Sequence, residues 1–300
     1  MKNLSKYLTA CALAATCIGA LPAQDKAPAS SGIPRVLVVQ REFVKPGKGG
    51  SAHEKTESAF VQAMAKAKWP THYLAWEAMS GKPRVLFFTF YESYEAWEKD
   101  GKAEEKNAAL SAALERANEA DGALLDSADQ SVFTFNQEFS LHPLSDLSQI
   151  RYLEIWVAHV KPGHYKEWSD MVKLLNTTSE KAVPTNHWGV FESAYGMPGG
   201  MYVFLTGRKS TAELDRGPME DKAFEAALGE EGLKKLDELF GACVESSEAQ
   251  LFALNAKMSY PPDEWVKADP DFWKPKAAGA APAAPATPAA KAVKKPEAKP

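Results

Sequence analysis

Residues 72–83, HYLAWEAMSGKP, decide the fold, because a second version of this stretch, HWGVFESAYGMP, stands at residues 187–198. Aligned without a gap, the two versions share a histidine, two aromatic positions, a glutamate, a glycine and a proline in the same order. An internal repeat of this kind indicates that one structural unit occurs twice in the chain. The two halves can therefore be compared with each other.

The segments around the repeated stretch predict the same elements in both halves. Each half opens with an apolar strand that ends in VKPG, at 44–47 and again at 160–163, and Pro-Gly after a strand is typical of a turn. Ser51 followed by Glu54 predicts a capping box that starts a helix, and apolar residues at helical spacing predict a helix around 168–175. Further strands are expected at 85–91, 131–139, 201–206 and 251–258, and further helices near 94–99 and at 104–125 and 232–241. The predicted order is β-α-β-β-α-β, twice.

This order is the ferredoxin-like arrangement, an antiparallel four-stranded sheet with both helices on one face. The other face of the sheet needs a cover, and two units in one chain can supply it for each other. We therefore predict an α+β protein in which tandem ferredoxin-like units, residues 35–141 and 151–260 with a linker at 142–150, form an intrachain α/β barrel. Such a pseudo-dimer is expected to be a monomer in solution.

With VKPG after the first strand of both units, the chain resembles the dimeric α/β-barrel superfamily, and within it the NIPSNAP and antibiotic-biosynthesis-monooxygenase branches. The resemblance covers about residues 35–260. Relatives bind small aromatic or polyketide-like molecules, some oxidise them without a cofactor, and others bind or break down haem. The resemblance thus implies a cavity for a small hydrophobic or aromatic ligand.

The chain departs from the residue patterns of these relatives. Cofactor-free oxygenases of the superfamily line their pocket with Asn, Trp and His or Tyr, and no full set stands in matching positions here. The haem-degrading branch uses an Asn on the first strand and a His on the second helix. At the matching strand positions this chain has Gln40 and Trp156, and neither predicted second helix contains a histidine. Haem cleavage is therefore not expected, and no cofactor is predicted.

Strand parity sorts the candidate pocket residues, since alternate side chains leave a strand on opposite faces. On the first strands, the parity of Leu37 and Ile155 is expected to face the helices, and the other parity the space between the sheets. On the repeated strands, parity leaves both faces open, and we expect the face with the two histidines to look inward. The predicted ligand-binding residues are Gln40, Trp76, Glu154, Trp156, Trp188 and Phe191, with His72 and His187 as candidate catalytic bases.

Each candidate also has a purely structural interpretation. A tryptophan can belong to the core, and a histidine can be a hydrogen-bonded structural residue. In each repeat the histidine and the glutamate are five positions apart, so a regular strand puts them on opposite faces and no metal site is expected there. Nucleotide-binding loops, the GxSxG elbow and HExxH are absent from the sequence.

The two ends of the chain carry different signals. Residues 1–23 have the charged start, apolar run and small-residue site of a secretory signal peptide, so we expect an exported protein, periplasmic or secreted. Residues 24–34 resemble a linker, and 261–273 carry three aromatic residues that are expected to dock on the units rather than stay in water. Residues 274–300, rich in Ala, Pro and Lys, are expected to be disordered.

Charge narrows the range of partners. Loss of the predicted signal would change the formal net charge from −4 to −6, and the tail holds six lysines and one glutamate, so the rest carries −11. An acidic body argues against nucleic acid. The basic tail could contact an anionic wall or membrane surface weakly, or serve as a solubilising tether. Cys243 would be the one cysteine left, which allows no intrachain disulfide.

Two functions stay open from the sequence. The first is an exported module that binds a small, hydrophobic or aromatic molecule in the space between the sheets, without turnover. The second is a cofactor-independent oxygenase that acts on a phenolic or quinol-like substrate. In that enzyme, His72 or His187 would be the base and the tryptophans would stack on the ring.

Overall fold

A computed structural model describes residues 32–274, and the predicted signal peptide, most of the first linker and nearly all of the basic tail lie outside the described residues. The first repeat holds β1 (Val36–Val44), α1 (Ser51–Ala67), β2 (Tyr73–Ala78), β3 (Arg84–Tyr91), α2 (Tyr94–Lys106), α3 (Ala108–Gly122) and β4 (Leu125–Phe135). The second holds β5 (Tyr152–Val160), α4 (Tyr165–Ala182), β6 (Gly189–Tyr195), β7 (Met201–Arg208), the 3₁₀ helix η1 (Thr211–Arg216), α5 (Gly217–Cys243) and β8 (Val244–Leu254). Two short helices follow, α6 (Asp263–Ala268) and α7 (Pro270–Trp273).

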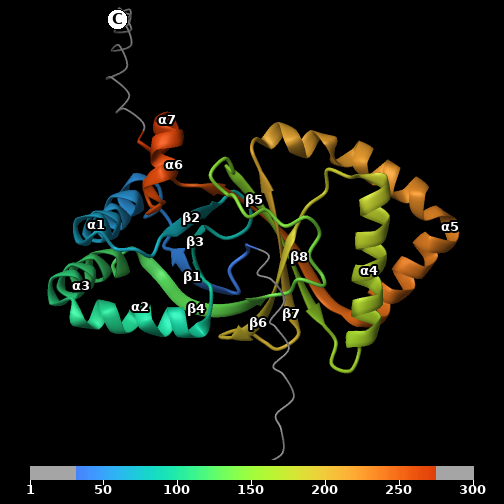
Figure 1. The fold of residues 1–300 in the computed structure, drawn as a ribbon, viewed down its shortest axis with the longest axis horizontal. Coiled ribbons are helices and arrows are strands. Elements are labelled where there is room, and N and C mark those ends of the chain that lie inside the picture. Colours follow the sequence, from blue (N-terminus) through green and yellow to red (C-terminus); the bar gives the residue numbers. More distant parts are fainter. Residues whose placement is uncertain (1–31, 275–300) are drawn as a thin grey trace, which may run out of the picture. The chain divides into compact units, whose positions relative to one another are not determined.

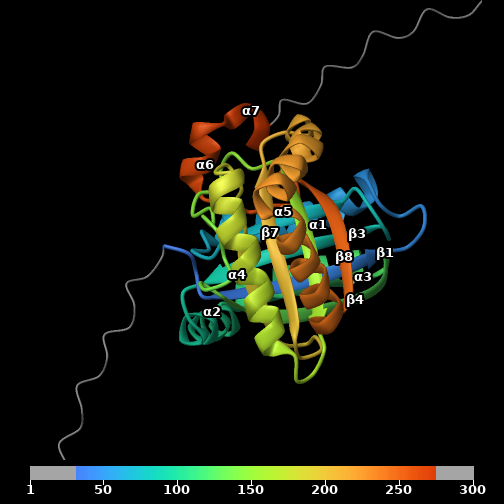
Figure 2. The ribbon, with the colours of Figure 1, turned by 90° about the vertical axis from the view of Figure 1, so that its right-hand side faces the viewer.

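The eight strands close into one antiparallel barrel in the order β1-β3-β2-β8-β5-β7-β6-β4 (Figures 1 and 2). Within it, each repeat contributes four neighbouring strands in the ferredoxin-like order. The repeats join where β2 pairs with β8 and where β4 pairs with β6. The predicted α+β class and the intrachain α/β barrel are therefore confirmed. The first strand of each repeat ends in the same irregularity. The pairing of β1 with β4 shifts register at Phe43/Val44, and the pairing of β5 with β8 shifts at His159/Val160, where VKPG begins in each repeat.

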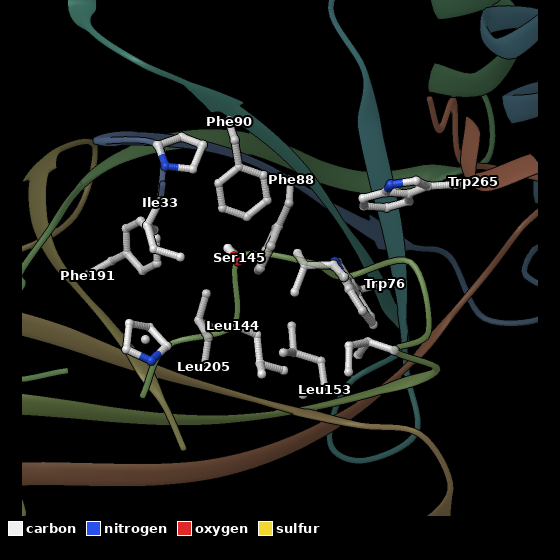
Figure 3. Close-up of a pocket in the computed structure, with 16 residues that line it drawn as sticks. Ile33, Trp76, Phe88, Phe90, Leu144, Ser145, Leu153, Phe191, Leu205 and Trp265 are labelled. Carbon is white, nitrogen blue, oxygen red and sulfur yellow. The ribbon is translucent and has the colours of Figure 1, made fainter. Parts of the chain in front are cut away.

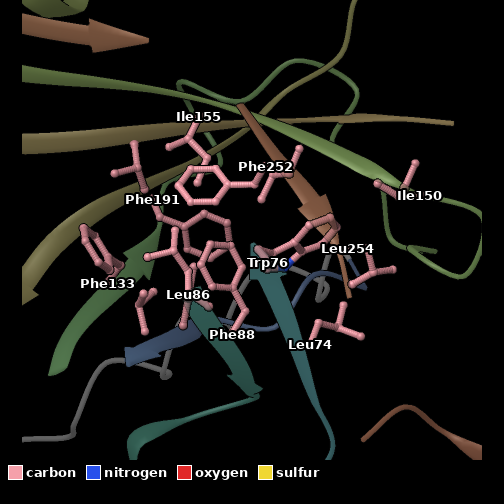
Figure 4. Packing of buried hydrophobic residues seen from close by; sticks show 14 of the residues in the cluster. Leu74, Trp76, Leu86, Phe88, Phe133, Ile150, Ile155, Phe191, Phe252 and Leu254 are labelled. Atoms are coloured by element: carbon pink, nitrogen blue, oxygen red, sulfur yellow. The ribbon is translucent and has the colours of Figure 1, made fainter. Parts of the chain in front are cut away.

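The inside of the barrel is an apolar core, which reverses the prediction for the first strands. Leu37 and Ile155, expected to face the helices, belong to a buried cluster with Trp76, Phe88 and Phe252 (Figure 4). The opposite parity lies under the helices, where Trp156 stacks on Trp168 of α4 with ring centroids 6.1 Å apart. An eight-stranded barrel is just wide enough for side chains to fill it, so the most apolar face of each strand points inward.

The helices lie outside the barrel, with α1, α2 and α3 over one side and α4 and α5 over the other (Figure 1). Helix α1 starts at Ser51 as predicted, but the capping box was wrong. Gly50 is the N-cap without a side-chain hydrogen bond, and the carboxylate of Glu54 instead accepts hydrogen bonds from Lys257 and Asn255. Helix α5 begins well before the predicted 232–241 and bends at Gly229, whose φ of 67° breaks the helical geometry.

A duplicated Asn-x-x-x-Ser turn fastens the two repeats together. After β8, the Asn255 N–H donates to the carbonyl of Ala75 on β2, and the Ser259 hydroxyl accepts from the Ala75 N–H at 2.9 Å. After β4, Asn136 and Ser140 make the same two bonds to Val190 on β6. Each turn therefore extends the pairing of the last strand of one repeat with the second strand of the other.

The aromatic extension packs over one end of the barrel. Trp273 is buried, and Trp265 packs against the same interior cluster. Arg151 holds the extension in place, because its guanidinium pairs with Asp269 at 2.5 Å and lies 3.8 Å from the ring centroid of Phe272. The extension therefore docks on the units as the sequence predicts, and because a closed barrel has no sheet edge, it packs at an end of the barrel. Within residues 32–274, no helix combines the length and apolarity needed to cross a membrane.

The turn after β8 yields the first testable prediction. Ser259→Ala leaves the N–H of fully buried Ala75 without its acceptor, so it should lower the free energy of unfolding by about 1–3 kcal/mol. Ser247→Ala, at an exposed position on β8, should change it by less than about 0.5 kcal/mol. Urea denaturation of both variants measures the difference, and equal stabilities would contradict the role given to this turn.

Candidate functional site

The barrel interior retains two cavities that share Phe88 and Leu205 in their walls. One has a volume of about 210 Å³ and is almost entirely apolar, with Trp76, Phe191 and Trp265 in its wall (Figure 3). The other, of about 430 Å³, has an apolar body and several polar side chains in its lining, namely Arg41, Lys82, Arg84, Ser131, Glu248 and Gln250.

The structure divides the predicted ligand-binding residues among separate places. Trp76 and Phe191 line the smaller interior cavity, so the face predicted to look inward on the repeated strands does so. Glu154 and Trp156 lie outside the barrel, where Glu154 pairs with Arg208 at 2.6 Å. Trp188 and Gln40 also lie on the outer face of the sheet, under the helices. The indole of Trp188 donates to the carbonyl of Phe139, and Gln40 lines a cavity beneath the helices of the first repeat.

The two candidate bases lie at the ends of their strands and line neither of the two interior cavities. His72 precedes β2 and lies against Tyr260, with ring centroids 4.9 Å apart. His187 precedes β6, and its ring nitrogens lie 3.1 Å and 2.9 Å from the carbonyl oxygens of Thr185 and Gly207. The structure does not bring these histidines into one cavity, and their catalytic role stays a prediction.

A larger cavity, of about 560 Å³, lies between the sheet of the first repeat and helices α1, α2 and α3. We call it the helix–sheet pocket. Its walls are aromatic and polar: Phe60, Trp69, Tyr73, Phe87, Tyr91 and Trp97 supply the rings, and Gln40, Thr71, Thr89, Asp100, Asn118 and Gln130 supply hydrogen-bonding groups. Glu104 and Glu115 line the pocket as well, and the carboxyl groups of Glu42 and Glu57 also face it.

The carboxyl groups of Glu42 and Glu57 belong to a fully buried cluster of four ionisable residues, Glu42, His53, Glu57 and Asp121. We call it the acid–histidine cluster. Each member is only 2–3% exposed. The His53 Nε2 atom lies 3.1 Å from Glu42, 3.4 Å from Asp121 and 3.9 Å from Glu57. Strand β1 supplies Glu42, helix α1 supplies His53 and Glu57 one turn apart, and helix α3 supplies Asp121.

Neighbouring side chains fix the orientation of the cluster. The amide of Gln40 donates to the second oxygen of Glu42 at 2.6 Å, and the hydroxyl of Thr56 donates to Asp121 at 2.5 Å. Burial alone would lower the pKa of His53, but hydrogen bonds to Asp121 and Glu42 outweigh it and raise the pKa to about 10. Burial raises the pKa of Glu57 well above its usual range, and the neighbouring Glu42 and Asp121 add to the effect.

The phenol groups beside the cluster are also held in the neutral form. Burial, and then the nearby Glu57 and Glu42, raise the pKa of Tyr73 far above its ordinary value. Its hydroxyl is buried and has no hydrogen-bond partner within the described part of the chain. Burial likewise raises the pKa of Tyr91, whose hydroxyl donates to Asp100 at 2.9 Å. The pocket therefore presents a free hydroxyl donor next to two carboxyl groups.

The second repeat shows that the fold does not require this cluster. Its buried pair one turn apart at the start of α4 is Trp168 and Val172, where α1 has His53 and Glu57. The strand position two residues before the VKPG valine is Ala158 there and Glu42 here. In the second repeat the space under the helices is closed by Trp156, Trp168, Trp188, Tyr202 and Phe204. One copy of the unit is packed with apolar side chains, and the other keeps a pocket and four buried ionisable groups.

The patterns that predict the fold do not predict the association of Glu42, His53, Glu57 and Asp121. The available signal was the His-x-x-x-Glu spacing of His53 and Glu57 on the face of α1 that also carries Phe60 and Met64. Ionisable residues one turn apart on an otherwise apolar face indicate a buried polar site. Asp121, 64 positions beyond Glu57, is brought in only by the packing of α3 on α1.

The closed eight-stranded barrel with helices on its outer face decides the fold assignment. The chain has the dimeric α/β-barrel fold. Among solved structures, a protein of Fusobacterium nucleatum subsp. nucleatum named as a putative monooxygenase matches with a TM-score of 0.50 and 12% identity over 74% of this chain and 93% of that one. An anthrone oxidase-like protein matches with a TM-score of 0.46 and 12% identity, over 74% of this chain and 92% of that one. A mutant chlorite dismutase of Candidatus Nitrospira defluvii matches with a TM-score of 0.44 and 8% identity, over 80% and 95%. No family model and no curated sequence matches the chain, so the narrower resemblance to the NIPSNAP and monooxygenase branches stays a prediction.

The contact that orients Asp121 can be tested without touching the cluster itself. Thr56→Val keeps the shape of the side chain and removes the hydroxyl, so it should lower the free energy of unfolding by about 1–2 kcal/mol. Thr177→Val is the matched control, because the Thr177 hydroxyl, exposed on α4, bonds only a backbone carbonyl. Chemical denaturation of the two variants checks this, and an equally small effect at both positions would contradict it.

Proposed function

We propose that the chain is an enzyme that oxidises a small phenolic or quinol-like molecule in the helix–sheet pocket of the first repeat. One observation carries the proposal: in the first repeat the acid–histidine cluster stands at the wall of a cavity of about 560 Å³ under the helices, whereas in the second repeat apolar side chains fill the corresponding space around Trp168. Perturbed ionisable groups beside a well-formed pocket are the usual mark of an active site.

The lining of the pocket suits a planar aromatic ring with hydroxyl groups. Its volume of about 560 Å³ lies inside the range of small-molecule sites, about 300–1,000 Å³. Tyr91 and Trp97, whose ring centroids lie 6.4 Å apart, offer faces on which a ring can stack. Gln40, Thr89 and Gln130 supply hydrogen bonds to substituents at the sheet side.

The reaction needs no group beyond the substrate, dioxygen and a proton acceptor. A phenol and O₂ give a quinone and water: one oxygen atom becomes the new carbonyl, and the other leaves as water with the two hydrogens that the substrate loses. Removal of the hydroxyl proton makes the ring electron-rich enough to react. The carboxylate of Glu42, which faces the pocket, is positioned to accept that proton, and this replaces the role first given to His72 or His187. The enzyme would act outside the cytoplasm, in the periplasm or after secretion, as the signal peptide predicted at residues 1–23 implies.

An oxygen-uptake assay with a panel of phenols and quinols tests the proposal, with two variants of Gln40. Gln40→Trp introduces the residue that fills the equivalent position in the second repeat, Trp156, so it should close the pocket and reduce uptake more than tenfold. Gln40→Ala removes the same amide, including its hydrogen bond to Glu42, but leaves the pocket open, so it should retain clearly more uptake than Gln40→Trp. No uptake by the native chain with any substrate of the panel, or full uptake by Gln40→Trp, would refute the assignment.

The larger interior cavity supports a second candidate, the binding of a hydrophobic acid in the barrel. Arg84 is 8% exposed and donates to the carbonyl of Lys82 and to Gln250, and its guanidinium lies 5.0 Å from the ring centroid of Phe252. No carboxylate of residues 32–274 lies within ion-pair distance of it. Glu248 lines the same cavity and acts on Arg84 electrostatically without pairing with it directly. A ligand carboxylate would supply the direct ion pair that this buried cation lacks.

The matched pair Arg84→Met and Arg41→Met tests this second candidate. Arg41 lines the same cavity but already forms a two-pronged pair with Asp129, at 2.6 and 2.7 Å. Isothermal titration with 1-naphthoic acid should show at least a tenfold loss of affinity in Arg84→Met and little change in Arg41→Met. Equal affinities in the two variants would exclude Arg84 as the carboxylate site.

A further inference from the structure

We propose that the acid–histidine cluster, Glu42, His53, Glu57 and Asp121, binds one divalent transition-metal cation. Each residue offers one ligand atom, and the four atoms all lie within 4.8 Å of one another. The separations from His53 Nε2 to the three carboxylate oxygens are 3.1, 3.4 and 3.9 Å. Metal–ligand bonds of about 2.0–2.2 Å place neighbouring ligand atoms about 3–3.6 Å apart, so the set needs only small adjustments.

A second observation, separate from the proximity of the acids, points to a ligand. The Oε1 atom of Glu57 is buried and lacks a hydrogen-bond partner among the described residues, although the residue is only 3% exposed. Of the two oxygen atoms of Glu57, this is the one that faces His53, at 3.9 Å from Nε2. A buried carboxyl oxygen without a partner is unfavourable. A cation held by the cluster would bond to it once Glu57 and His53 release their protons, so metal binding would be coupled to proton release.

The groups around the cluster have the arrangement of an outer coordination shell. Gln40 binds the oxygen of Glu42 that does not face His53, and Thr56 bonds to Asp121. Outer hydrogen bonds of this kind fix the orientation of metal ligands. The ligands come from three elements, β1, α1 and α3, so a bound cation would join the sheet to both helices.

The chemistry of the donors narrows the choice of cation. Three carboxylates favour hard cations such as Mn²⁺, whereas an imidazole favours Zn²⁺, Fe²⁺ and their neighbours. One histidine with three carboxylates therefore suits Mn²⁺, Fe²⁺ or Zn²⁺ better than Ca²⁺, which takes oxygen ligands alone. The absence of cysteine from the cluster argues against a soft cation such as Cu⁺.

The metal site deepens the proposed function without depending on it. Because Glu42 and Glu57 also face the helix–sheet pocket, a cation in the cluster would lie beside a bound hydroxyl group. If the proposed function holds, the cation rather than a free carboxylate would favour loss of the hydroxyl proton. Metal binding itself is measured without any substrate, so the failure of one proposal can be told from the failure of the other.

Titration of the full chain, freed of metal by EDTA and dialysis, tests the site. Isothermal titration with Mn²⁺ and with Zn²⁺ should show one tight site per chain, and thermal unfolding should shift upward with added cation. Co²⁺ serves as the spectroscopic probe, because a bound Co²⁺ ion gives visible absorption that reports nitrogen and oxygen ligands. Zn²⁺ should displace that signal.

Matched variants identify the ligands. Glu57→Gln and Asp121→Asn keep the shape of their side chains and should each weaken binding at least tenfold. Glu54→Gln, on the same helix but outside the cluster, should leave the affinity unchanged. His159→Gln removes an exposed histidine that pairs with Glu245 at 2.7 Å, and it excludes a surface site as the source of the signal.

Three results would overturn the proposal: no site tighter than millimolar in the native chain, native affinity in Glu57→Gln and Asp121→Asn, or loss of the site in His159→Gln. If a cluster variant does not fold, the Co²⁺ spectrum of the native chain decides, because absence of a bound-cobalt signal is sufficient to reject the site. Oxygen uptake before and after EDTA treatment then shows whether the cation takes part in turnover.

Discussion

The whole structure depends on the backbone pairing of each repeat's second strand with the other repeat's last strand. A single ferredoxin-like sheet would leave one apolar face and two edges open to water. Pairing of β2 with β8 and of β4 with β6 removes both edges, and the two Asn-x-x-x-Ser turns continue that pairing beyond the strands. Once the barrel is closed, its interior must be filled, and the most apolar face of every strand turns inward.

Closure of the barrel also determines where the acid–histidine cluster lies. Side chains such as Trp76 and Phe252 occupy much of the interior, and the cluster lies on the outer face of the sheet, under the helices. In the first repeat this layer is polar around Glu42 and His53, and in the second it is aromatic around Trp156 and Trp168. The two copies of the scaffold thus differ in this layer: apolar side chains pack it in the second, and the first keeps the helix–sheet pocket.

Much of the fold was predictable, because it is written in local patterns. The duplicated stretch at residues 72–83 and 187–198, together with VKPG in both halves, specified two copies of one unit and hence the barrel. The candidate site was not predictable in the same way. Strand parity separates two faces, but it cannot tell which face lies inside, since both faces of β1 include apolar residues and both are partly buried.

The sequence by itself determined the element order, the duplication and the barrel, since these depend on periodicity and turn residues that act over short distances. Tertiary structure alone decided that Glu42, His53, Glu57 and Asp121 meet, because β1, α1 and α3 must pack before residues up to 79 positions apart come within contact. Such an association depends on the packing of three elements, and no local pattern encodes it.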